Sequence, residues 1–445
     1  MRKFMHVSMT YLSGGLLGAG ACALLAATAA HAGGFGVREQ SVYYMGTAFA
    51  GAASGGQISS VFWNSAATAA LPGCNTSSNY TGIFASGDES ARSGRLVTGV
   101  PPVAPGLTPT SADIGQDGFV PSSFVTCQLS DRAYVGLGLN APFGLFTKPD
   151  NTTWAGSPIA ITSKVFSVDI NPTIAYKLTP EWTVGVGVQI EYFKLRLTHG
   201  AFNSLLGPIS GSRSFEADDW GVGATAGVLW QPSPATSVGL GYRSAVGIDA
   251  EGSFVRTAPG AVSTNATGSL TLPDEVTLSA RQVVAPRWAV LGTVEWQNWS
   301  RLGNVAAVSS GCGASGVCEV LNLNYRDGWY FALGAEYAYS PAILLRAGVG
   351  YEISPIKDSN RDILIPDSNR VFLSVGGSYK YSEQISVDLA YSHLFFEDAP
   401  FCIASQVGNG GSSHCNAGTQ PPAVLLRGSS DNSADLVAVG LRYRF

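Results

Sequence analysis

Side chains able to carry out covalent catalysis are scarce in this chain. Beyond residue 32 the histidines are His199, His393 and His414. Ser392 beside His393 is the nearest arrangement to a nucleophile with its base. The sequence contains no G-x-S-x-G turn, no phosphate-binding G-x-x-x-x-G-K-[ST] loop, no H-E-x-x-H and no C-x-x-C. We therefore expect neither an enzyme nor a cofactor-dependent protein.

The six cysteines beyond residue 32 favour disulfides over a metal site. An even number of cysteines in an exported chain is typical of disulfide bonding. Two of the pairs are close in sequence and fall in long polar stretches, whereas the third is left open. The pairs are Cys312 with Cys318, Cys402 with Cys415, and Cys74 with Cys127. Metal ligation would need histidine or acidic partners at regular spacing, which are absent, so we expect no metal.

The first 32 residues have the features of a secretory signal peptide. Arg2 and Lys3 precede an apolar stretch from about Leu12 to Ala30, and Ala30-His31-Ala32 is a cleavage motif. We expect residues 1–32 to be removed. The loss of two positive charges lowers the formal net charge from −5 to about −7. That charge argues against nucleic acid as a partner.

The clearest structural signal is the alternation at the carboxyl end. One face carries apolar residues only and the other carries small or charged ones. The first face has Val437, Val439, Leu441, Tyr443 and Phe445, and the second has Ala438, Gly440, Arg442 and Arg444. Such a strand, ending on an aromatic residue, is typical of an outer-membrane β-barrel. No stretch after residue 32 has about 18 consecutive apolar residues, so we expect no membrane-spanning helix.

Alternating segments of this kind recur from about residue 76 to residue 445. We count fourteen, separated by short turns and long polar stretches in alternation. A barrel with tight turns on the periplasmic side and long loops outside produces this rhythm. The sequence therefore predicts an all-β fold, a 14-stranded antiparallel transmembrane β-barrel at residues 76–445, in the outer membrane of a Gram-negative bacterium.

Residues 33–75 lack strand character and are rich in glycine and alanine. Roughly 43 residues are too few to form a good core alone. They would be stable inside a barrel, which at this strand number otherwise holds a water channel. We predict an N-terminal lumenal plug at residues 33–75.

The fifth predicted strand contains a change of phase. Its apolar residues are even-numbered from Val184 to Tyr192 and odd-numbered from Phe193 onward. A slip of one residue predicts a β-bulge. Past it, Lys194 and Arg196 would point inward near the outer end, where a cation could bind a carboxylate head group. The alternative is that they are solvated charges at the rim.

Short motifs recur in a specific order along the mature chain. They are Gly34-Phe35-Gly36-Val37-Arg38-Glu39-Gln40, Val61-Phe62-Trp63-Asn64-Ser65-Ala66, Leu139-Asn140-Ala141-Pro142-Phe143-Gly144-Leu145 and Glu295-Trp296. Together they resemble the FadL/TodX family of outer-membrane transporters of long-chain fatty acids and other hydrophobic compounds. The family usually has Asn-Pro-Ala where this chain has Asn64, Ser65 and Ala66, a departure that bears on the rigidity of the plug turn.

The resemblance implies a route for an apolar ligand. The ligand would bind an outer groove, pass to an apolar pocket near the mature amino-terminus that Phe35 lines, and leave sideways at a kink of the third strand. The residues matching that gate are Gly136, Gly138, Asn140, Pro142, Phe143 and Gly144. Read without the resemblance, the same residues describe a strand end and a turn.

We therefore expect passive outer-membrane transport of hydrophobic compounds, most of all long-chain fatty acids. One alternative is uptake of aromatic or aliphatic hydrocarbons, and a further one is a general diffusion porin. A third is a surface adhesin or phage receptor that uses the loop at 398–431. The expected partners are a small hydrophobic molecule and outer-membrane lipid, with the protein a monomer.

Overall fold

In the computed structural model, residues 33–96, 110–152, 154–157, 160–202, 209–257, 260–405, 412–414 and 424–445 are described. The expected signal peptide, Cys415 and much of the loop at 398–431 lie outside these residues. No helix in the described part of the chain is long and apolar enough to cross a membrane.

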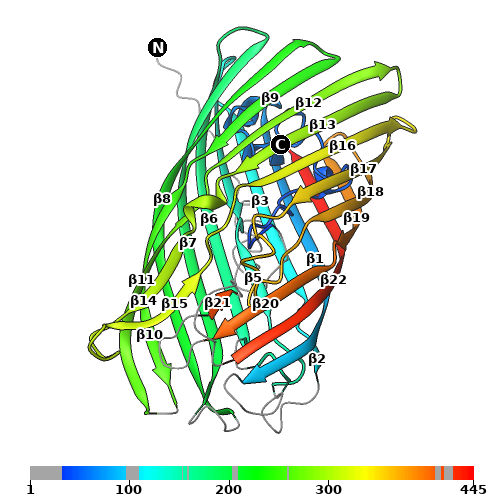
Figure 1. Ribbon diagram of the computed structural model, residues 1–445. Coiled ribbons are helices and arrows are strands. Elements are labelled where there is room, and N and C mark those ends of the chain that lie inside the picture. The colour runs from blue at the N-terminus through cyan, green and yellow to red at the C-terminus, as the bar shows by residue number, and fades with distance from the viewer. Residues whose placement is uncertain are drawn as a thin grey trace, which may run out of the picture.

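The chain forms a closed antiparallel barrel of fourteen strands, which confirms the predicted fold class (Figure 1). The strands that run unbroken are β1 (Cys74–Leu96), β3 (Gly118–Gln128), β6 (Thr162–Lys177), β7 (Trp182–Phe202), β8 (Ile209–Ser233), β17 (Ile343–Ile353), β18 (Arg370–Lys380) and β22 (Val424–Arg444).

The other strands of the barrel each consist of two segments separated by a short interruption or a loop. They are β4 (Ala133–Asn140) with β5 (Gly144–Thr147), β9 (Thr236–Arg243) with β10 (Val246–Arg256), β11 (Val262–Leu272) with β12 (Glu275–Ala285), β13 (Trp288–Gln297) with β14 (Asn304–Val308), β15 (Val317–Asn322) with β16 (Gly328–Ala338), and β19 (Ile385–Phe396) with β20 (Ala399–Ser405). The short β2 (Ser111–Asp113) pairs with β1, and β21 (Ser412–His414) pairs with β20.

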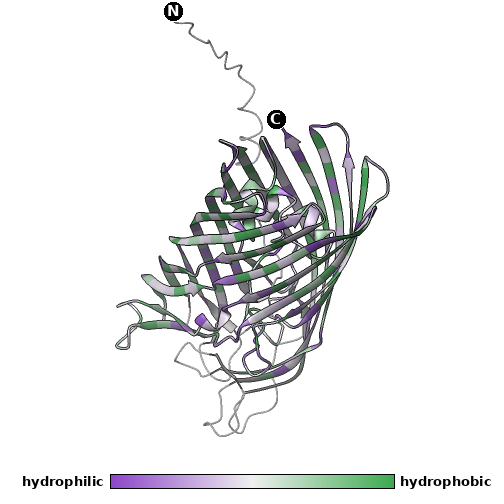
Figure 2. Cartoon of the chain, turned by 90° about the horizontal axis from the view of Figure 1, so that it is seen from above, coloured by the Kyte–Doolittle hydropathy of each residue, from purple (hydrophilic) through white to green (hydrophobic). Residues whose placement is uncertain are grey.

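The carboxy-terminal strand closes the barrel. β22 pairs with β1 from Asn75 opposite Arg444 onward, and with β19 on its other edge. Its outward Val437 is 54% exposed, whereas the inward Ala438 is 4% exposed. Hydrophobic and hydrophilic residues alternate along the strands throughout the wall (Figure 2). The predicted alternation of strand faces is confirmed here.

The amino-terminal segment, defined here as residues 33–73, packs against the inner side of this wall (Figure 1). It contains α2 (Val42–Met45) and the 3₁₀ turns η2 (Ile58–Phe62) and η3 (Ser65–Ala69). Residues 33–55 and 58–69 are all buried. Side-chain hydrogen bonds join it to the barrel, as between Tyr43 and Glu336 at 2.7 Å and between Thr68 and Thr173 at 2.8 Å. The domain boundaries proposed from the sequence stay predictions.

Glycines on the inner wall make room for the backbone of this segment. A Cβ atom at Gly241 would collide with the carbonyl oxygen of Trp63, and one at Gly348 would collide with that of Thr47. Backbone atoms cannot rotate away as a flexible side chain can. The barrel and the amino-terminal segment therefore touch main chain to main chain at these positions.

We expect Gly241→Ala to destabilise the barrel because its methyl group has no space beside Trp63. Overpacking of this kind costs about 1–3 kcal/mol, so the thermal unfolding midpoint in detergent, followed by circular dichroism, should fall by several degrees. Gly247→Ala is the matched control, since a Cβ there meets no atom within 4 Å. Equal midpoints for the two variants would contradict this account.

Candidate functional site

The predicted bulge in the fifth strand of the barrel is wrong. β7 pairs with β8 without a shift from Trp182 opposite Trp230 to Ala201 opposite Gly211. Even-numbered residues of β7 therefore face outward on both sides of Tyr192. The phase change in the sequence reflects a change of surroundings rather than a backbone slip. Toward the end that bears the long loops, termed the outer end here, the polar face is outside and the apolar face is inside.

Lys194 and Arg196 consequently point away from the interior, and the inward orientation predicted for them is wrong. Their side chains are 40% and 55% exposed. The Lys194 Nζ lies 2.7 Å from Glu216 Oε1, and the Arg196 Nε lies 3.9 Å from Glu216 Oε2. An exposed ion pair of this kind contributes little to stability. These are charges on the outer surface, which was the alternative reading of the sequence.

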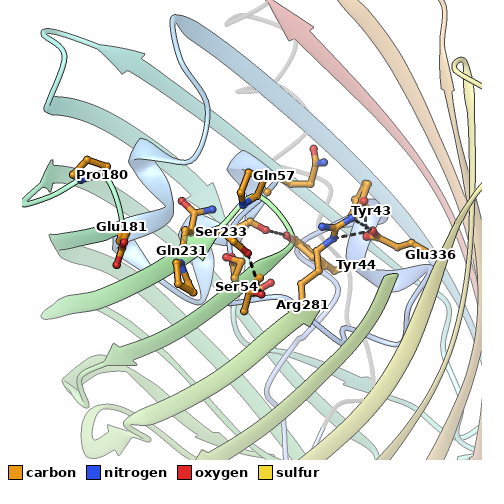
Figure 3. A pocket seen from close by; sticks show the side chains of 16 residues that line it. Tyr43, Tyr44, Ser54, Gln57, Pro180, Glu181, Gln231, Ser233, Arg281 and Glu336 are labelled. Atoms are coloured by element: carbon orange, nitrogen blue, oxygen red, sulfur yellow. Dashed lines mark hydrogen bonds and ion pairs between the residues drawn. The ribbon is translucent and has the colours of Figure 1, made fainter. Parts of the chain in front are cut away.

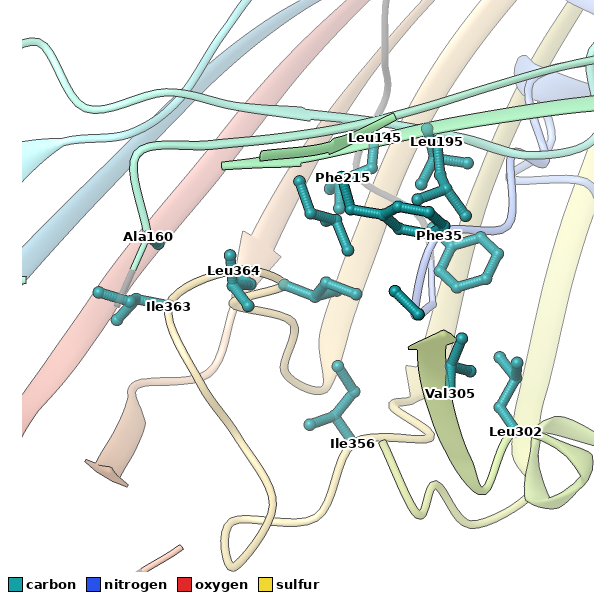
Figure 4. Packing of buried hydrophobic residues seen from close by; sticks show 14 of the residues in the cluster. Phe35, Leu145, Ala160, Leu195, Phe215, Leu302, Val305, Ile356, Ile363 and Leu364 are labelled. Atoms are coloured by element: carbon teal, nitrogen blue, oxygen red, sulfur yellow. The ribbon is translucent and has the colours of Figure 1, made fainter. Parts of the chain in front are cut away.

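The inward residues of the same strand belong to a large apolar cluster. We define the outer apolar cluster as the buried hydrophobic residues that gather inside the outer half of the barrel (Figure 4). It includes Phe35, Phe143, Leu145, Trp154, Phe193, Leu195, Leu197, Phe215, Trp299, Val305, Ile356 and Leu364. Burying an alkyl group among such residues gains about 0.8 kcal/mol for each CH₂ removed from water.

Phe35 lies within this cluster. Its ring centroid is 4.8 Å from that of Trp299, 6.0 Å from that of Phe143 and 6.1 Å from that of Phe193. Gly34 before it has a positive φ of 65° and donates its N–H to Asp367 Oδ2 at 3.0 Å. The structure thus brings together two predicted site residues, Phe35 and Phe143, that are far apart in the sequence.

The third strand of the barrel is interrupted where the sequence placed a gate. β4 ends at Asn140 and β5 begins at Gly144. β4 pairs with β3 only as far as Leu139 opposite Ser123, and β5 pairs with β6 alone. Among the described residues, β3 positions 118–122 therefore have no strand partner on this side. Gly136, further back in β4, lies against Thr68 of the amino-terminal segment.

The amino-terminal segment takes the place of the missing partner. Val37 donates its N–H to the Pro142 carbonyl at 2.7 Å, and Gly144 donates to the Phe35 carbonyl at 2.8 Å. The Gln40 side chain donates to the Ala141 carbonyl at 2.8 Å and accepts from the Ala141 N–H at 3.2 Å.

Gln40 also reaches the opposite side of the interruption, because its carbonyl accepts from the Ser122 hydroxyl of β3 at 2.7 Å. It thereby bridges β3 and the interrupted part of the third strand, where the two do not pair. This role is not predictable from the sequence, in which the residue's place in the first motif is its only signal.

The turn at Asn64, Ser65 and Ala66 is tied to the barrel at several points. Asn64 caps η3 by accepting from the Ala66 N–H at 3.0 Å, and its amide donates to the Val228 carbonyl at 3.0 Å. The Ser65 hydroxyl donates to Thr225 at 2.6 Å. The serine thus forms a bond to the wall that a proline has no donor to make.

Charged residues form a buried network between the outer apolar cluster and the inner half of the segment. Arg38 lies 2.7 Å from Glu295 and 3.2 Å from Glu352, and Arg370 lies 2.6 Å from Glu352. Glu39, 1% exposed, has an Oε2 atom without a hydrogen-bond partner among the described residues. Burial raises the pKa of Glu39 to about 7, although Arg370 and Arg38 oppose the rise.

A polar cavity of about 700 Å³ opens at the inner end, beside the turns at Pro180 and Pro232 (Figure 3). Glu336 lies at its side, accepting from Tyr43 at 2.7 Å and pairing with Arg281 at 2.7 Å. Because its lining is polar, unlike the outer apolar cluster, an apolar ligand would gain little free energy by binding here.

Disulfides join Cys74 to Cys127 and Cys312 to Cys318. Cys402 is also disulfide-bonded, and Cys415 lies outside the described residues. The first of these bonds links the start of β1 to β3, directly after the amino-terminal segment. In the part of the chain that is described, no three His, Cys, Asp or Glu side chains group as metal ligands.

Known proteins share this fold and sequence pattern. The pattern of a family described as outer membrane protein transport protein (OMPP1/FadL/TodX) matches residues 23–445. The long-chain fatty acid transport protein of Salmonella typhi is 26% identical over 324 residues, covering 65% of this chain and 74% of its own. Outer membrane protein P1 of Haemophilus influenzae is 26% identical over 465 residues, covering 95% and 97%.

Two solved structures support the same fold. A FadL homologue of Pseudomonas aeruginosa superposes with a TM-score of 0.81 at 20% identity, covering 93% of this chain and 100% of its own. The toluene transporter TbuX of Ralstonia pickettii has a TM-score of 0.65 at 17% identity, covering 93% and 99%.

Glu39 should make stability depend on pH. Its pKa in the folded protein, about 7, is above its ordinary value of 4.5. The folded state is therefore favoured below that ordinary value and loses stability as pH rises through about 7. We expect Glu39→Gln to remove this loss, so that its advantage over wild type grows to about 3 kcal/mol above pH 8. Unfolding midpoints between pH 4.5 and 8 measure it.

The exposed Glu181→Gln serves as the control for this series, since Glu181 lies on the surface of a turn. A wild-type midpoint that falls in parallel with that of Glu39→Gln across the range would show that Glu39 does not titrate as described.

Proposed function

This chain belongs to the OMPP1/FadL/TodX family of outer membrane transport proteins, and we propose that it is a passive channel whose preferred cargo is a long-chain fatty acid. Its homologues support outer-membrane transport of hydrophobic compounds as the general function, and the family is one of transporters rather than enzymes. The carrying observation is the outer apolar cluster, which is enclosed by the wall and by Phe35.

The extent of this cluster favours a long acyl chain over a single ring. It runs from Phe35 and Trp299 to Ile363 and Leu426, with contributions from many strands of the barrel. A ligand of many CH₂ groups gains more from such a surface than a small aromatic does. The relative from Salmonella typhi, by its name a long-chain fatty acid transport protein, supports the same preference.

Two donors for a carboxylate head group lie in this cluster and directly beside it. The indole Nε1 of Trp154 and the hydroxyl of Ser157 are buried, at 0% exposure, and have no hydrogen-bond partner among the described residues. Buried donors without partners are costly unless a ligand pairs with them. We propose that the fatty acid head group accepts from them, in place of the surface cations Lys194 and Arg196.

The exit is proposed at the interruption between Asn140 and Gly144. There the wall is completed by hydrogen bonds to the amino-terminal segment rather than by a continuous ladder. Movement of Gln40 would break only a few hydrogen bonds here. Opening the wall between two continuous strands elsewhere would break many more. A ligand held against Phe35 and Phe143 would lie next to this point.

Replacing Trp154 with phenylalanine should separate the two ligand classes. The ring is kept and the N–H is lost, so we expect oleate uptake by cells lacking their own transporter to fall about tenfold, with toluene uptake unchanged. Trp182→Phe is the control, because Trp182 lies on the outward face of the wall, away from the cluster. The double variant Lys194→Ala with Arg196→Ala should transport oleate as wild type does. Unchanged oleate uptake in Trp154→Phe would refute the head-group assignment.

The porin alternative requires an open, water-filled interior. A general diffusion porin conducts ions through a water-filled lumen. Since the amino-terminal segment is buried against the wall, we expect planar bilayers containing the wild-type protein to show no steady ion conductance. Deletion of residues 34–69 should produce steady ion conductance. Steady conductance by wild type would favour the porin.

A further inference from the structure

A row of oxygen-bearing side chains crosses three neighbouring strands where β4 ends. Asn140 of β4 lies opposite Asp169 of β6, which in turn lies opposite Glu191 of β7. All three point into the barrel and are no more than 1% exposed. Like charges directly opposite each other on one face of a sheet repel. Asp169 and Glu191 form such a pair, away from the water that would screen them.

Asp169 Oδ2 accepts from Arg243 at 2.9 Å and from the Asn140 amide at 3.5 Å, but the other oxygens of this row lack donors. Among the described residues, Asn140 Oδ1, Asp169 Oδ1 and both carboxylate oxygens of Glu191 have no hydrogen-bond partner. Neither has Oδ1 of Asn171, two residues along β6 on the same face. The Ser167 hydroxyl lies near Glu191 but does not reach hydrogen-bonding geometry with it. Buried oxygens are rarely left unpaired in such number.

Neighbouring charges do not neutralise the row. Arg243 of β9 lies 2.9 Å from Asp169 Oδ2, and Glu275 of β12 lies opposite Arg243. Three carboxyl groups thus surround one guanidinium, so full ionisation leaves two negative charges without a cation. Arg38, the next guanidinium, is already held between Glu295 and Glu352.

We propose that Asn140, Asp169 and Glu191 bind a single calcium ion, with Asn171 as a further ligand. Carboxylate and amide oxygens are the donors that Ca²⁺ prefers, in flexible geometry and with water completing the shell. No nitrogen or sulfur donor belongs to the row, which argues against zinc. A divalent ion matches the two uncompensated charges. A proton on Glu191 would satisfy one oxygen and leave those of Asn140 and Asp169 unpaired.

The ion would join the last residue of β4 to β6 and β7, immediately before the interruption. Phe143, within the interruption, already donates its N–H to Ser167 at 2.9 Å. Calcium therefore fixes the strand end from which the chain leaves the wall. This site stands on the geometry of the row and is independent of the cargo proposed above.

Calcium binding to the full mature chain in detergent tests the proposal. After treatment with a chelator, isothermal titration with CaCl₂ should show one ion per chain, and the unfolding midpoint should rise with calcium. We expect Glu191→Gln and, independently, Asn140→Ala to weaken binding at least tenfold. Glu216→Gln, which removes an acid on the outer surface, should bind as wild type does.

Absence of calcium binding by wild type would overturn the site, as would binding that Glu191→Gln and Asn140→Ala both retain in full. The second variant keeps the test decisive if the first does not fold. Because neither readout measures uptake, failure here leaves the transport proposal untouched, and failure of oleate uptake leaves the calcium site untouched.

Discussion

The hydrogen bonds between residues 35–40 and the interrupted third strand are the contacts on which the rest of the interior depends. They supply partners to backbone groups that the barrel leaves unpaired, since a buried N–H or C=O without one is costly. The same contacts place Phe35 in the outer apolar cluster and Arg38 between two carboxylates. The wall, the outer apolar cluster and the charged network are therefore aligned by one short stretch of chain.

The interior changes character along the barrel axis. At the outer end β7 presents Phe193, Leu195 and Leu197 inward and charged residues outward. Within the membrane zone the pattern is reversed, with valines outside and Glu191 inside. The same continuous alternation of the β7 backbone runs through both zones, which differ only in whether water or lipid lies outside. An apolar interior at the outer end is thus obtained without a change of fold.

Period-two alternation was enough to predict the closed barrel, as in the strand from Val437 to Phe445, because a sheet with lipid on one face leaves little choice of residue. Phe35 lies in the outer apolar cluster and β4 ends at Asn140, whereas their roles as pocket and gate stay predictions. The error at Lys194 arose because a phase change has two physical causes, a bulge or an exchange of environments, and the residues alone do not separate them. That Asp169 and Glu191 are neighbours could not be predicted, since the spacing of residues along the chain does not determine which residues of adjacent strands lie opposite each other.

Close contact between the wall glycines and the amino-terminal segment means that these two parts of the sequence must evolve together. Where Gly241 and Gly348 meet main-chain atoms of Trp63 and Thr47, no side chain is present to absorb a shift. Substitutions in one partner therefore require compensation in the other, although the two lie far apart in the gene. Hybrids that combine the beginning of one relative with the cylinder of another should fit poorly, and divergence in this lineage would proceed by matched pairs rather than by exchange of modules.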